Sequence, residues 1–79
     1  YPNPFNNSTV IAYDLFENSH VQINIYNLRG QKIRTLFEAD QQMGRHSLSF
    51  DAFGLSSGMY LYELQTNRGA TAKKLLLLK

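Results

Sequence analysis

The side chains best able to support catalysis or bind a metal are two histidines, His20 and His46, and one close pair of acids, Asp14 and Glu17. A histidine can take up and release a proton near neutral pH, and two carboxylates can divide acid and base roles. Neither histidine has a carboxylate at the sequence spacing typical of a metal site. The two acids sit where a turn is expected, which is typical of solvated side chains.

The other potential sites also have simpler structural explanations. His46 alternates with Leu48 and Phe50, which indicates a histidine at the rim of a core. The segment "GLSSG" (54–58) lacks the following lysine of a phosphate-binding loop. No serine or threonine has an evident base partner, and the absence of cysteine excludes disulfides and thiolate metal sites. We therefore predict a domain that is not an enzyme and that needs neither a cofactor nor a metal.

Four tyrosines, Tyr13, Tyr26, Tyr60 and Tyr62, leave a binding role open. Aromatic side chains on one exposed face could stack against sugars. In small β-domains such residues more often pack in the core and across strands, with the hydroxyl group at the rim. Packing is the favoured interpretation, and sugar binding stays an alternative.

The hydrophobic pattern has a period of two, which predicts strands and leaves no segment for a helix of useful length. Asparagine-, glycine- and proline-containing turns separate the strands. Ile33 and Leu36 fall out of the alternation and indicate a bulge, and Gly69 is expected to close a hairpin loop in a left-handed conformation. The predicted strands are 9–15, 20–27, 32–37, 45–51, 58–64 and 70–78.

These strands predict one all-β domain over residues 1–79, a small immunoglobulin-like antiparallel β-sandwich of about six or seven strands. Its last segment, "TAKKLLLLK", is unusual because four consecutive leucines lie between lysines. Four residues are far fewer than the roughly 20 of a membrane-spanning helix. The charge is +2 overall, and every charged residue from Arg68 onward is basic. Four charges without interleaved aromatics give little support to nucleic-acid binding, and lysines are typical guards of an edge strand.

Taken together, four segments resemble a known family: "YPNPFNNST", "VQINIYNLRGQKI", "GRHSLSFDAFGLSSGMYLYEL" and "AKKLLLLK". They are similar, in order and spacing, to the type A C-terminal sorting domain of type IX secretion cargo, found in Bacteroidota and related bacteria. Asn7 and Phe16 depart from the pattern at positions where the family often has proline, and both lie in predicted turns. The resemblance implies that the chain is a fragment of a longer cargo protein.

The resemblance further implies that the domain is a non-catalytic C-terminal secretion signal. Such cargo crosses the periplasm, is recognised by the type IX translocon and its shuttle proteins, and reaches the cell surface or the medium. A surface sortase then removes the domain and anchors the N-terminal cargo domain. The family's recognition motifs fall here on Gly58, Met59, Tyr60, Lys73, Lys74, Leu75, Leu76, Leu77, Leu78 and Lys79.

The terminal leucines are expected to form a strand in which one row of side chains is buried and the other is exposed to the secretion machinery. Removal of residues 76–79 is then expected to abolish export with little effect on thermal melting. Two alternatives remain open: a sugar-binding or spacer β-sandwich of a surface enzyme, and a structural assembly module like the flagellar hook cap. Dimerisation through a sheet edge is also left open.

Overall fold

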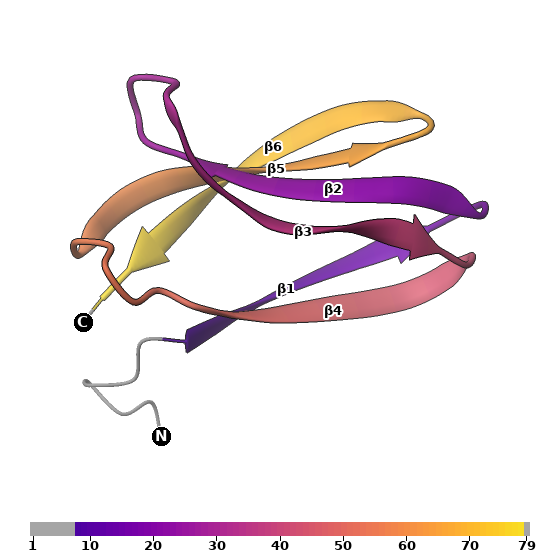
Figure 1. The fold of residues 1–79 in the computed structure, drawn as a ribbon, viewed down its shortest axis with the longest axis horizontal. Helices are drawn as coiled ribbons and strands as arrows, with labels where there is room; N and C mark the ends of the chain where they lie inside the picture. Colours follow the sequence, from indigo (N-terminus) through magenta and orange to yellow (C-terminus); the bar gives the residue numbers. More distant parts are fainter. Residues whose placement is uncertain (1–7, 79) are drawn as a thin grey trace.

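The computed structural model describes residues 8–78, which form six strands and, within that range, no helix and therefore no helical membrane span (Figure 1). The strands are β1 (Ser8–Leu15), β2 (Ser19–Tyr26), β3 (Lys32–Gln41), β4 (Gly44–Asp51), β5 (Gly58–Thr66) and β6 (Gly69–Leu77).

The strands build two antiparallel sheets, one of two strands in the order β1-β4 and one of four in the order β3-β2-β5-β6. The shortest dimension of the molecule is 16 Å, which suits two twisted sheets stacked about 10 Å apart. The prediction of a small antiparallel β-sandwich is confirmed. Within residues 8–78, β3 and β6 are the edge strands of the larger sheet, and β1 and β4 each have one edge without a partner strand.

The core is centred on β2, which pairs with β3 on one side and β5 on the other. Val21, Ile23 and Ile25 alternate along β2 and are completely buried, as the period-two pattern predicts. They pack in one hydrophobic cluster with Ile11 of β1 and Phe50 of β4. The smaller sheet therefore covers the centre of the larger one with these inward rows.

β3 differs from the prediction in length. Its pairing with β2 passes over Ile33 and Leu36, so the predicted irregularity is confirmed at both residues. The strand then continues to Gln41 instead of ending at Phe37. The apolar signal ends early because the last part of β3 is polar on its exposed side, where Glu38 and Asp40 point toward β2.

The hairpin between β5 and β6 has the predicted form. β5 ends at Thr66 and β6 begins at Gly69, whose φ of 120° is unfavourable for side-chain-bearing residues. Asn67 in the turn donates its backbone N–H to Oγ of the buried Ser19, at 2.8 Å. This contact ties the hairpin to the start of β2.

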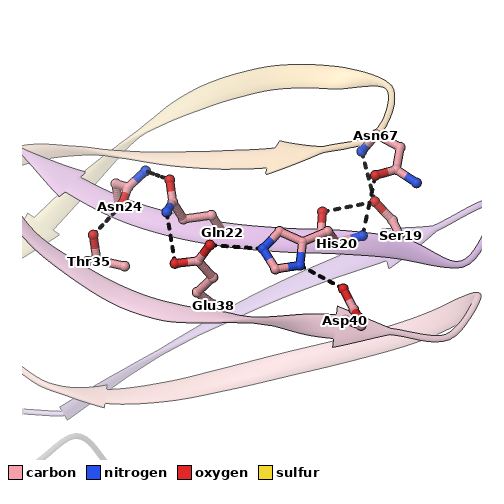
Figure 2. Close-up of polar contacts among 8 residues, drawn as sticks. All are labelled: Ser19, His20, Gln22, Asn24, Thr35, Glu38, Asp40 and Asn67. Carbon is pink, nitrogen blue, oxygen red and sulfur yellow. Dashed lines mark hydrogen bonds and ion pairs between the residues drawn. The ribbon is translucent and has the colours of Figure 1, made fainter.

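The outer face of the larger sheet carries a polar network around Asn24, which is completely buried (Figure 2). Its Nδ2 donates to Gln22 Oε1 and to Glu63 Oε1, both at 3.1 Å, and its Oδ1 accepts from Thr35 Oγ1 at 2.8 Å. Burial of Glu63 acts to raise the pKa of its carboxyl, but several hydrogen bonds together hold that pKa below its usual range. The network joins β3, β2 and β5 through side chains as well as backbone.

At the other end of this network, His20 lies between two carboxylates of β3 (Figure 2). Its Nε2 is 2.9 Å from Glu38 Oε2, and its Nδ1 is 2.7 Å from Asp40 Oδ1. The hydrogen bond with Glu38 and then that with Asp40 raise the pKa of His20, and the bond with His20 lowers the pKa of Glu38. Sequence spacing did not indicate this arrangement, because the three residues meet only through the β2–β3 register.

We predict that His20 stabilises the fold in a limited range of pH. A neutral imidazole can donate to only one of the two carboxylates, whereas the imidazolium donates to both. Because its folded-state pKa is raised, the stabilisation is complete below the unfolded value of about 6.5 and is lost as pH rises through the folded pKa. The stability difference between wild type and His20→Gln, measured by urea denaturation, should be largest near about pH 5.5 and shrink toward alkaline pH. A difference that does not change with pH would contradict this.

A second prediction concerns Asn24. The Asn24→Ala variant should lose about 1–3 kcal/mol of unfolding free energy, since Glu63 and Thr35 lose a partner at a buried position. Denaturant unfolding measures the loss, and Ser47→Ala, at an exposed position of β4, is the matched control. Equal stability of the two variants would show that water replaces the amide without cost.

Candidate functional site

The two segments singled out near the end of the sequence lie side by side on neighbouring strands. Residues 58–60 begin β5 and residues 75–77 end β6. The register pairs Gly58 with Leu77, Met59 with Leu76, and Tyr60 with Leu75. We call the surface formed by residues 58–60 and 73–78 the leucine edge, because β6 is an edge strand of the larger sheet.

One row of the leucine edge points into the sandwich. Tyr60 and Leu77 are 8% and 5% exposed, and Leu75 is half-buried against the same core cluster. The Tyr60 hydroxyl donates to the backbone carbonyl of Ser56 at 2.7 Å, which fixes the loop that leads into β5. Gly58, where that loop ends, has a φ of 148°, a conformation that residues with a side chain rarely adopt.

The other row of the leucine edge faces solvent. Met59, Leu76 and Leu78 are 40%, 55% and 72% exposed, and Met59 and Leu76 are direct cross-strand partners. The expectation of one buried and one exposed leucine row is confirmed. The buried Leu77 also changes the expectation for a truncation, since removing residues 76–79 takes a core side chain away and should lower stability as well.

Two lysines precede the leucines on the same edge strand. Lys73 pairs with Tyr62 and Lys74 with Leu61, and because successive side chains alternate, the two lysines leave β6 on opposite faces. Lys73 lines an open groove that Tyr62 and Leu64 share with Tyr13 of β1. Lys79, the last predicted site residue, lies outside the described residues, as does Asn7.

Three of the four residues first considered for catalysis have structural partners: His20, His46 and Asp14. Glu17 is exposed in the turn between β1 and β2. His46 stacks on Tyr13 with ring centroids 5.6 Å apart, and its Nε2 is 2.7 Å from the backbone carbonyl of Gln42. Asp14 lies 3.5 Å from Arg45 on the paired strand. Within residues 8–78, no group of three histidine or acidic residues could hold a metal ion.

The tyrosines do not share an exposed face. Tyr13 and Tyr60 are core residues, and Tyr62 packs partly against the core. Tyr26 lies on the outer face of the larger sheet, where its hydroxyl donates to Glu63 Oε1 at 3.0 Å and the pKa of the phenol is raised by that bond. The packing interpretation is confirmed for Tyr13, Tyr60 and Tyr62.

Comparison with known proteins identifies the family of the chain. Neither a curated protein nor a solved structure matches the chain. The family model described as a secretion system C-terminal sorting domain matches residues 1–78. This match includes all described positions of the leucine edge. The chain therefore belongs to the family of C-terminal sorting domains that serve as sorting signals of type IX secretion.

Proposed function

We propose that the leucine edge is the surface by which the type IX translocon and its shuttle proteins recognise this domain. The observation that carries the proposal is the pairing of residues 58–60 with residues 75–77, at the open end of the β5–β6 hairpin, into one local surface. A recognition signal split between two strands is assembled only when the domain folds. The machinery can therefore test folding and identity through the same contact.

The chemistry of the edge supports a protein partner. Met59, Leu76 and Leu78 form an exposed apolar row beside charged Lys74, a combination typical of interaction sites. None of the other described strands pairs with the outer edge of β6, whose backbone groups could take an additional strand from a receptor. Lysines on both faces of the strand disfavour pairing with unrelated edges, including a second copy of the domain.

The later steps are proposed on the family relationship. The N-terminal cargo domain of the same chain would cross the periplasm with this sorting domain, pass the outer-membrane translocon, and reach the cell surface or the medium. A surface sortase would then cleave off the sorting domain and anchor the cargo. None of these steps requires a catalytic residue, metal or cofactor in the domain itself.

The first test is a fusion of residues 1–79 to a fluorescent reporter directed to the periplasm of a Bacteroidota host. We expect the reporter outside the cell in the wild-type strain and inside it in a strain that lacks the type IX translocon. Reporter retained in the periplasm of both strains, with the domain folded, would contradict the sorting role and favour a binding or spacer module.

The leucine edge itself is tested by separating its two rows. In the fusion, Leu76→Ser with Leu78→Ser should abolish export while the unfolding free energy changes by no more than about 0.5 kcal/mol, because both side chains are exposed. Leu77→Ala should instead lose about 2–5 kcal/mol of stability, because it empties a core position. External fluorescence and thermal melts of the purified domains provide the two readouts.

A matched control is Phe16→Ser with Met43→Ser, which removes two exposed apolar side chains at the opposite end of the sandwich. Export of this variant should match wild type. Equal loss of export in the control would mean that any decrease in surface hydrophobicity is sufficient and that the leucine edge has no special part.

A further inference from the structure

The exposed apolar side chains are concentrated at one end of the sandwich, and the leucine edge accounts for only some of them. This end consists of the start of β1, the β2–β3 turn, the β4–β5 loop, the start of β5 and the end of β6 (Figure 1). Of nine large hydrophobic residues exposed within residues 8–78, seven lie here and only Phe16 and Met43 lie at the opposite end. Four of the seven are outside the leucine edge, and we call them the apolar tip: Val10, Leu28, Ile33 and Phe53.

Two strongly exposed residues of the apolar tip are on turns with a fixed backbone. Phe53 is 76% exposed, yet its N–H donates to Asp51 Oδ1 at 2.9 Å and its carbonyl accepts from Arg34 Nη2 at 2.9 Å. Leu28 is 63% exposed in a turn whose backbone is held by Asn27, the side-chain oxygen of which accepts two backbone N–H groups. Residues already ordered in an exposed position lose little conformational entropy when they bind.

The charges of the molecule are divided between its ends in the same way. The end of the sandwich with the apolar tip has three cations, Arg29, Lys32 and Arg34, against one described acid, Asp51. Glu63, Lys73 and Lys74 lie farther along β5 and β6 and are counted at neither end. The opposite end has the reverse balance, with four acids against two cations: Asp14, Glu17, Glu38, Asp40, Arg45 and Arg68. An anionic surface would attract the apolar tip and repel the opposite end, so the charge alone orients the domain.

The directions of the side chains of the apolar tip favour a lipid phase over a protein partner. Val10 lies on the outer face of the β1–β4 sheet, Leu28 lies on the β2–β3 turn, and Phe53 lies on the β4–β5 loop. A protein usually contacts one face, whereas these side chains surround the end. Those of them that belong to strands are at most two residues from the end of their strand, which is a distance of about 7 Å along the strand. Interfacial proteins bury apolar groups about 5–10 Å into the boundary of headgroups and acyl chains.

We propose that this end of the sandwich inserts into the surface of an anionic lipid bilayer, with the apolar tip among the acyl chains and Arg29, Lys32 and Arg34 at the phosphate level. Each basic residue near an anionic surface strengthens binding about fivefold. The proposal goes beyond the sorting function and does not depend on it, since lipid binding requires no translocon. It explains tip residues such as Leu28 and Phe53, which are not part of the leucine edge.

The test measures sedimentation of purified residues 1–79 with phosphatidylcholine vesicles that either contain or lack phosphatidylglycerol. We expect binding to the anionic vesicles, weaker binding to the neutral ones, and release by high salt. Leu28→Ser with Phe53→Ser should lower the partition coefficient at least about tenfold. Phe16→Ser with Met43→Ser removes two exposed apolar residues at the opposite end and should leave it unchanged.

The cations are tested in the same assay. Arg29→Gln with Lys32→Gln should weaken binding to the anionic vesicles, whereas Arg45→Gln with Arg68→Gln should not. Thermal melts establish that each variant is folded. The proposal is overturned if wild type does not sediment with anionic vesicles, if both apolar pairs have the same effect, or if neutral vesicles bind equally well; absence of sedimentation would favour a protein partner for the tip.

Discussion

The burial of β2 is the constraint on which the rest of the structure depends. β2 is flanked by β3 and β5, and its three inward side chains are completely covered. A strand that is central in a sheet and covered on its inner face can adopt only one register, because a slip by one residue would turn its apolar row outward. That register positions β5, and β5 in turn positions β6. The leucine edge therefore depends on a strand with which it has no direct pairing.

The outer face of the same strand is organised by hydrogen bonds instead of apolar packing. Asn24 is as fully buried as its apolar neighbours, and all of its polar side-chain atoms have partners within the sheet. Such a network stabilises only the arrangement in which every member is satisfied. The apolar inner row and the polar outer row thus specify the same register. The larger sheet can therefore leave its outer face uncovered and still adopt a single strand register.

Uneven coverage accounts for the surface properties of the domain. Two strands cannot cover four, so edges and apolar side chains remain accessible around β6 and at the end of the sandwich that contains the β4–β5 loop. In an isolated protein such features promote association, and Lys73 and Lys74 oppose it on the edge itself. The accessible apolar residues are clustered instead of scattered, and they coincide with a basic end of the molecule. Both the proposed sorting surface and the proposed lipid contact follow from this incomplete sandwich.

The sequence alone determined the class of the fold, the strand positions and the alternation of β6. These are local properties: a period of two, turn residues such as Gly69, and a run of leucines too long for one buried row. It also indicated irregularity at Ile33 and Leu36. What only the tertiary structure decided is how residues of neighbouring strands are brought opposite one another. The continuation of β3 to Gln41, the meeting of His20 with two acids, and the pairing of residues 58–60 with 75–77 all result from register, and register is set by packing of the whole sheet, not by any one segment.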